Sequence, residues 1–245
     1  MATVLLRLSG PMQAYGTSSH WEERATRSRP TKSAVIGLIV NALGLSADTP
    51  LDDFTSMTFA VRADRPGRQM RDEQTAGGGR FPPADPRNPN PGPDYGAPRD
   101  PALTPEGTLR ASRKKGSRQP VLVTKHYLED AAFLAGLSTE DLPLSHTIDN
   151  ALRRPARLLF LGRHCCPPAQ QIAHGVTPHG PDQWPSHISL LPEATDAQPA
   201  VWTEVPPTTG AFPSSENPVS FTARHHTTLF LRTSTVLPPA PELQQ

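Results

Sequence analysis

The pattern of hydrophobic and polar residues is clearest in the stretch Arg29–Gly44, which predicts a buried helix. Thr31 can cap the first turn through its hydroxyl, and Gly44 is a typical stop signal. Between them, hydrophobic residues occur on almost every side, as in helices that pack across a sheet. Gly37 interrupts the helix at a cost of roughly 1 kcal/mol relative to alanine. We therefore expect another backbone to approach Gly37 closely.

The first turn of this helix is basic. Arg29, Lys32 and Ser33 gather there without an acidic residue, although helix N-termini favour acids. Free amides together with nearby cations can bind a phosphate or another anion. Two interpretations stay open: Arg29 and Lys32 hold an anion, or both are simply solvated.

Further hydrophobic segments predict strands around this helix. They are Thr3–Leu8 (with one face to the core), Met57–Ala63, Pro120–Leu128, Ala131–Leu137 and Arg157–Leu161. A second helix follows Ser138–Asp141, which resembles a capping box, and ends before Pro155. The order strand, helix, strand, strand, helix, strand over residues 3–161 predicts an α+β fold with a ferredoxin-like (RRM-like) core.

Composition divides the chain into three predicted parts. Residues 1–74 and 119–161 form the core, and residues 75–118 form a Pro/Gly-rich insertion with a basic root. Because Thr75–Pro105 holds almost nothing that could be buried, we expect the insertion to project. Residues 162–245 form a small β-rich unit. Its expected strands are Val201–Val205, Val219–Ala223 and Thr228–Val236.

Composition also limits the chemistry. With a net charge of +1, any role in nucleic-acid binding must rest on local clusters of basic residues. No apolar run reaches the roughly 18 residues of a membrane helix and no signal peptide is evident, so we expect a soluble, cytoplasmic protein. The acids and histidines match no metal-site spacing, so no metal or cofactor is expected. Cys165 and Cys166 are adjacent, which suits neither an ordinary disulfide framework nor a zinc site.

Two regions are candidates for RNA binding. The loop after the first strand carries Met12, Gln13 and Tyr15, which either stack on and hydrogen-bond to a base or fill a local core. The root of the insertion carries a basic run, which is either a solvated face or a clamp on a phosphate backbone. Its members are Arg110, Arg113, Lys114, Lys115 and Arg118.

The strand after the insertion contains Lys125, His126 and Tyr127. Metal-free RNA cleavage needs a base and a cation, which His126 and Lys125 could supply. Adjacent residues of a strand point to opposite faces, however, so these two would not converge without a bulge. Lys125 and Tyr127 share a face, which favours binding over catalysis.

Six motifs in order resemble the CasD-type subunits of type I-E CRISPR Cascade, members of the RAMP superfamily. The motifs are LRLSGPMQAYG, RPTKSAVIGLIVNALG, DEQTAGGG, KHYLEDAAF, FLGRHCCP and FTAR. The resemblance implies a ferredoxin-like core with a thumb and a small C-terminal unit. The insertion departs most from the family, being longer and richer in proline.

The resemblance also implies a function. Such a subunit caps the surveillance complex, grips the 5′ handle of CRISPR RNA, and contacts the large PAM-reading subunit and the terminal backbone subunit, rather than acting as a free homo-oligomer. It would place Gln13, Tyr15, Arg29 and Lys32 near the handle. In type I-E systems another subunit cuts the repeat, which argues against catalysis. Relatives in type I-C do cleave the precursor, which keeps Lys125 and His126 as the alternative of a metal-independent endoribonuclease.

Charge reversal of Arg113, Lys114 and Lys115 to glutamate should weaken binding of handle RNA and flatten its salt dependence. Each phosphate contact on a single strand contributes roughly 0.7 to the slope of log affinity against log salt. Filter binding over a salt series measures that slope. An unchanged slope would contradict the assignment of this run to the phosphate backbone.

Overall fold

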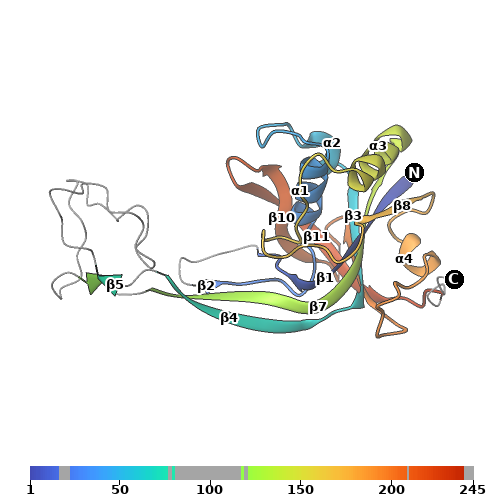
Figure 1. The fold of residues 1–245 in the computed structure, drawn as a ribbon. Coiled ribbons are helices and arrows are strands. Elements are labelled where there is room, and N and C mark those ends of the chain that lie inside the picture. The colour runs from blue at the N-terminus through green and yellow to red at the C-terminus, as the bar shows by residue number, and fades with distance from the viewer. Residues whose placement is uncertain (17–22, 77–78, 81–116, 119–120, 209, 240–245) are drawn as a thin grey trace. The chain divides into compact units, whose positions relative to one another are not determined.

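The computed structural model describes residues 1–16, 23–76, 79–80, 117–118, 121–208 and 210–239 (Figure 1). The chain divides into two compact units. The first comprises Met1–Thr17, Ala25–Met70 and His126–Gln245, and the second Ser18–Arg24 and Arg71–Lys125. Most of the predicted insertion, residues 75–118, lies outside the described residues.

Strands dominate the described residues. The helices are α1 (Lys32–Ala42), α2 (Asp52–Thr55), α3 (Leu142–Arg153) and α4 (Trp184–His187). The strands are β1 (Ala2–Gln13), β2 (Glu23–Arg24), β3 (Thr58–Arg65), β4 (Arg68–Ala76), β5 (Gly79–Arg80), β6 (Ser117–Arg118), β7 (Val121–Thr139), β8 (Ala173–Thr177), β9 (Ala200–Val205), β10 (Phe212–Ser220) and β11 (His225–Thr235). None of the helices described is long and apolar enough to cross a membrane.

One sheet runs through the fold in the order β10-β11-β9-β3-β7-β1-β8, and β2 and β4 pair with β7 off this path. Neighbours along the path are antiparallel. The connectivity β1-α1-β3-β7-α3-β8 follows the predicted order of strands and helices. The α+β prediction is therefore confirmed. Strands β5 and β6 form a separate pair.

The closing strand is not where the sequence suggested. Arg157–Leu161 is irregular, and the strand that pairs with β1 after α3 is β8. The backbone of Leu161 explains the difference, because its N–H donates to Cys166 O at 2.7 Å and its carbonyl accepts from Ala14 N at 3.0 Å. These bonds close a local loop instead of extending a ladder.

The two strands predicted at Pro120–Leu128 and Ala131–Leu137 are one long strand, β7. At their junction Asp130 adopts a positive φ of 56°. The register with β1 skips one residue on each strand there, passing from Gly10 opposite Ala131 to Met12 opposite Glu129. The skipped residue of β1 is Pro11, which has no N–H to donate to the ladder.

The buried helix α1 forms as predicted. Thr31 Oγ1 accepts from the N–H of Ala34 at 3.2 Å, and Gly44 has a φ of +72° just past the end. The expectation for Gly37 is wrong. A Cβ built there would meet only the ring of Phe221, at an ordinary 3.7 Å, and Gly37 is half-buried.

Both faces of the sheet are covered. Helices α1 and α3 pack on one face (Figure 1), where Leu6, Ile36 and Phe133 belong to the main core. On the other face Leu5 and Leu134 pack beneath Trp184 of α4. The prediction that β1 turns only one face to the core is therefore wrong, because the segment around α4 covers the second.

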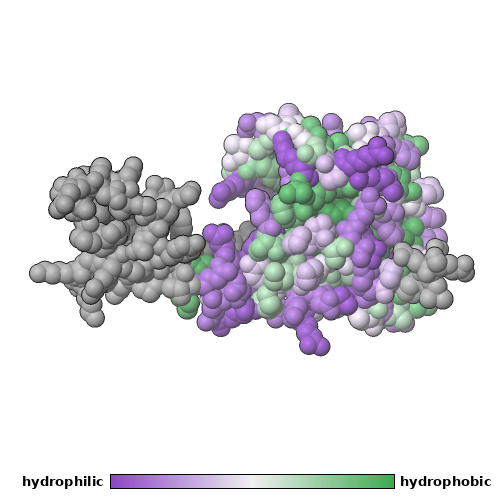
Figure 2. Space-filling view, in the orientation of Figure 1, coloured by the Kyte–Doolittle hydropathy of each residue, from purple (hydrophilic) through white to green (hydrophobic). Residues whose placement is uncertain are grey.

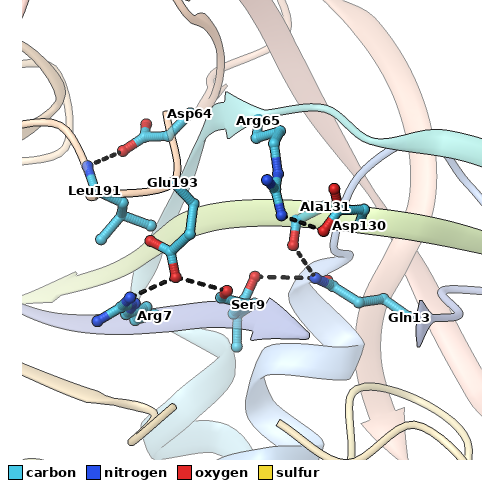
Figure 3. Close-up of polar contacts among 10 residues, drawn as sticks. Arg7, Ser9, Gln13, Asp64, Arg65, Asp130, Ala131, Leu191 and Glu193 are labelled. Atoms are coloured by element: carbon cyan, nitrogen blue, oxygen red, sulfur yellow. Dashed lines mark hydrogen bonds and ion pairs between the residues drawn. The ribbon is translucent and has the colours of Figure 1, made fainter. Parts of the chain in front are cut away.

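A buried ion pair holds that covering segment. Arg62 and Asp64 are separated by one residue on β3, and both side chains are fully buried. The distance from Arg62 Nε to Asp64 Oδ1 is 2.6 Å. The Arg62 guanidinium donates to the carbonyls of Pro185, Ile188 and Ser189. The Asp64 carboxylate accepts from the N–H of Leu191 at 2.7 Å (Figure 3).

Details at the C-terminus also differ from expectation. The strand predicted at Val201–Val205 is β9, and the one predicted at Thr228–Val236 is β11. The segment predicted as Val219–Ala223 is largely a turn, because β10 lies earlier and ends at Ser220.

The cap of α3 also differs in detail from the predicted capping box. The capping residue is Asp141 itself, whose side chain accepts a hydrogen bond from the N–H of Leu144 at 2.8 Å.

Gly37→Ala should stabilise the protein by about 0.5–1 kcal/mol, because a helix-interior alanine loses less backbone entropy than glycine and its Cβ meets no obstacle. The matched control is Gly136→Ala, whose Cβ would lie 2.8 Å from Trp184 Nε1 and 2.9 Å from Thr3 Cγ2. That variant should be less stable by roughly 1–3 kcal/mol. Thermal unfolding compares the two. A lower melting temperature for Gly37→Ala would contradict the packing described for α1.

Candidate nucleic-acid interface

The basic turn at the start of α1 binds carboxylates of the protein itself. Arg29 is 5% exposed, and its guanidinium makes two hydrogen bonds with the Glu216 carboxylate, at 2.6 and 3.1 Å. Lys32 is fully buried, and its ammonium lies 2.9 Å from Glu204 and 2.8 Å from the carbonyl oxygen of Thr55. The interpretation as a solvated face is therefore wrong for these two residues, and the anions that they hold are carboxylates of the chain itself.

The surroundings of Lys32 and Arg29 leave little capacity for another ligand. Burial lowers the pKa of the Lys32 ammonium, while the nearby Glu204 carboxylate opposes that shift. Glu204 also accepts the backbone N–H of Phe59 at 2.9 Å. The Arg29 guanidinium lies 5.9 Å from the ring centroid of Trp202. This end of α1 is thus a structural junction with β9 and β10.

The loop after β1 is also turned inward. Gln13 is fully buried, and its amide donates to the carbonyls of Ala131 at 2.7 Å and Leu8 at 3.1 Å (Figure 3). Its Oε1 accepts from the Tyr15 hydroxyl at 2.7 Å. Burial raises the pKa of Tyr15, whose ring packs edge-on to Phe133 at 6.5 Å. Met12 is half-buried against the main core.

Gln13 and Tyr15 therefore have internal partners for all the polar atoms with which they would read a base. These two side chains fill a local core, which was one of the two interpretations of the loop. Their burial does not fit the other interpretation, direct contact with RNA.

The other predicted residues are dispersed. Ser33 Oγ lies 3.0 Å from His226 Nε2, and Lys125 donates to the side chain of Gln74. Arg118 belongs to β6, where only its backbone is described. The remainder of the basic run lies outside the described residues, namely Arg110, Arg113, Lys114 and Lys115.

Tyr127 is buried, at 3% exposure, and it joins half-exposed and exposed groups of the loop after α3 in a cluster that we call the Arg163 cluster. Its members are Tyr127, Phe160, Arg163, His164 and Cys165. The Arg163 guanidinium lies 4.6 Å from the centroid of the Tyr127 ring. The rings of Phe160 and His164 stack at 4.9 Å with an interplanar angle of 29°. Tyr127 Oη is 3.6 Å from Cys165 Sγ.

A tight loop presents this cluster. Gly162 has a φ of +96°, and a Cβ there would lie 1.7 Å from the carbonyl oxygen of Ala14, so only glycine fits. The N–H of Cys166 donates to Arg163 O at 2.9 Å, which closes the turn. Arg163 also donates to the backbone carbonyl of His126 at 3.1 Å, which ties the loop to β7.

The composition of the Arg163 cluster suits single-stranded nucleic acid. Stacking on aromatic rings and cation–π contact with arginine are the two contributions that bind bases without strict sequence preference. The members Phe160, Arg163 and His164 were part of the FLGRHCCP motif, yet sequence reasoning used that motif only for the family. The signal that could have identified them is an arginine and two aromatic rings beside the glycine of a tight turn.

A hollow of about 580 Å³ lies elsewhere in the first unit, beside Pro11 and the bend of β7. Its lining includes Arg65 and Arg68 but also Glu129 and Asp130, and Arg65 pairs with Asp130 (Figure 3). Because the charges of both signs offset one another, this hollow is a poor site for a phosphate backbone.

Lys125 and His126 are consecutive on β7, both half-exposed. Across the part of the chain that the structure describes, His, Cys, Asp and Glu form no group of three or more that could hold a metal ion.

Comparison with known proteins identifies the family of this chain. Residues 3–233 match the family model described as "CRISPR-associated protein (Cas_Cas5)". The chain belongs to this Cas5 family. Among curated proteins, "CRISPR system Cascade subunit CasD" of Escherichia coli (strain K12) is 28% identical over 169 residues, covering 67% of this chain and 66% of that protein. The aligned part is thus just under two thirds of the relative's length.

Two solved structures are similar to the chain over nearly its whole length. A chain of a "CRISPR RNA-guided surveillance complex" is similar with a TM-score of 0.72 and 27% identity, over 98% of this chain and 93% of that one. A structure described as "Crystal structure of Cas protein" has a TM-score of 0.67 and 24% identity over 98% of both chains, which supports the fold. The resemblance seen in the sequence is therefore confirmed at the level of the family.

Glu216→Leu should lower the free energy of unfolding by about 3–5 kcal/mol, since it leaves the buried Arg29 guanidinium without its carboxylate. Adding Arg29→Met should recover most of that loss, because a buried pair can often be replaced by apolar residues at little cost. The control Asp182→Asn removes the exposed pair with Arg232 and should cost at most about 1 kcal/mol. Urea unfolding measures all three. A Glu216→Leu variant as stable as the control would show that the pair is not decisive.

Proposed function

We propose that this protein is a non-catalytic subunit of a type I-E CRISPR surveillance complex that binds the 5′ handle of CRISPR RNA. The observation that carries the proposal is the agreement of fold with a chain of an RNA-guided surveillance complex over 98% of this chain. Membership of the Cas5 family and the relationship to a Cascade subunit support the same assignment.

The Arg163 cluster is the proposed RNA contact within the described residues. Arg163 supplies a cation, and the stacked Phe160 and His164 supply an aromatic platform for a base. The basic run at Arg110–Arg118 is proposed to hold the phosphate backbone, as its sequence indicates. In this proposal Gln13, Tyr15, Arg29 and Lys32 act indirectly, by fixing the elements from which the contacts project.

Contacts with a large subunit and a backbone subunit are part of the proposal. Figure 2 shows hydrophobic residues at the surface in the region of α1 and the segment after α3. Leu158, in that segment, is 79% exposed, and Leu142 at the start of α3 is 49% exposed. A contiguous exposed apolar patch is typical of a surface that a partner covers, and we propose that these leucines belong to such a surface.

Arg163→Gln should weaken binding of single-stranded handle RNA by about tenfold and reduce the salt slope by roughly 0.7, the contribution of one phosphate contact. Arg232→Gln is the matched control, because Arg232 is exposed and pairs with Asp182. Fluorescence anisotropy over a salt series tests both variants. Equal losses in the two variants would mean that only overall charge matters, and the Arg163 cluster would not be the interface.

Incubation with labelled repeat RNA, in chelator and in magnesium, separates this function from the endoribonuclease alternative. The proposal expects intact RNA with the wild-type protein and with His126→Ala. Removing a general base costs on the order of 10²–10⁴ in rate. Cleavage at one repeat position that disappears in His126→Ala would therefore establish an endoribonuclease instead.

A further inference from the structure

The loop of the Arg163 cluster contains two adjacent thiols that the proposed function does not use. Cys165 is exposed and Cys166 is buried, and their sulfur atoms lie 3.9 Å apart. Cys165 Sγ also contacts the Tyr127 hydroxyl at 3.6 Å. A single turn thus contains an accessible thiol, a second thiol within reach of it, and a contact with the proposed interface.

We propose that Cys165 and Cys166 are a redox-active vicinal dithiol, oxidised by a hydroperoxide to a disulfide that weakens RNA binding through Tyr127 and Arg163. The effect on RNA rests on the proposed function, whereas the thiol chemistry does not.

The environments of the two sulfur atoms assign their roles. The hydrogen bond with Tyr127 is the main cause that lowers the pKa of Cys165, and the Arg163 guanidinium acts in the same direction. Burial raises the pKa of Cys166 to about 11. The thiolate is the reactive form of cysteine, so the exposed Cys165 is the group that attacks and Cys166 is the one that resolves.

The chemistry balances in two steps. The Cys165 thiolate forms an S–O bond with one peroxide oxygen as the O–O bond breaks, and the departing alkoxide or hydroxide takes up a proton. The Cys166 sulfur then displaces hydroxide from the resulting sulfenic acid. The S–S bond forms, the S–O bond breaks, and hydroxide leaves as water with the Cys166 proton. Two electrons pass from the two thiols to one peroxide, and a dithiol reductant reverses the change.

Geometry predicts that the disulfide is strained and easily reduced. Adjacent residues have Cα atoms about 3.8 Å apart, below the roughly 4.4–6.8 Å usual for disulfides. Such strained bonds are the labile and regulatory ones.

Closing the bond should also disturb the interface. The sulfur atoms must approach from 3.9 Å to about 2.05 Å. Cys166 is fully buried in the main core and its backbone is held at both N–H and carbonyl, so Cys165 is the residue that moves. That movement breaks the contact with Tyr127, the ring on which Arg163 rests.

The experiment treats the purified full-length protein with hydrogen peroxide and follows two separate readouts. Intact-mass and peptide analysis should show loss of both free thiols within one monomer, restored by dithiothreitol. Cys165→Ser should not react, and Cys166→Ala, chosen because this side chain is buried, should stop at a sulfenic acid that dimedone traps. A disulfide between monomers, or no loss of thiols, would overturn the proposal.

Anisotropy with handle RNA is the second readout. Oxidised wild-type protein should bind about tenfold more weakly than reduced protein, comparable to losing one stacking contact. Cys165→Ser should bind equally before and after peroxide. If the disulfide forms and affinity is unchanged, the coupling to the interface is wrong. If the reduced wild-type protein fails to bind handle RNA, the proposed function fails, and the thiol readout still decides the redox chemistry.

Discussion

The desolvation of charges at the start of α1 constrains the rest of the fold. A guanidinium and an ammonium without water are tolerated only when paired and hydrogen-bonded, and Arg29 and Lys32 find their carboxylates on β10 and β9. The C-terminal strands therefore have to pack where Glu216 and Glu204 meet α1. Specificity follows from the cost of leaving either charge unpaired, more than from the net energy of each pair.

A second pair applies the same constraint to the opposite face of the sheet. Arg62 and Asp64 point away from α1, and together they bind the backbone of residues 185–191. Without that segment both charges would face solvent and Leu134 would lose its cover. The sheet is thus covered on one face by α1 and α3 and on the other by an irregular segment held through its carbonyl and amide groups.

These long-range pairs separate the features that could be predicted from the sequence from those that could not. Helix α1 was predictable because its cap, stop and apolar pattern are local. The carboxylates that neutralise its basic turn lie 187 and 172 residues away, so no local pattern could reveal them. The missed strand has a similar origin: RLLFL at 157–161 is more hydrophobic than AHGVT in β8, but the backbone of Leu161 bonds to Ala14 and Cys166, and β8 is the segment that pairs with β1.

For the candidate interface, the sequence motif was recognised but the role of its residues was not predicted. Arg163, Phe160 and His164 are ordinary in a sequence, and they become a site because Gly162 lets the loop turn against Ala14 while Arg163 reaches β7. The same turn forces Cys165 outward and Cys166 into the core. One backbone constraint thus sets the exposure of the arginine, the stacking of the rings and the inequality of the two thiols. A change that relaxes the turn at Gly162 would alter all three together, whereas a substitution at Cys165 leaves the turn in place and removes only the thiol with its contacts to Tyr127 and Cys166.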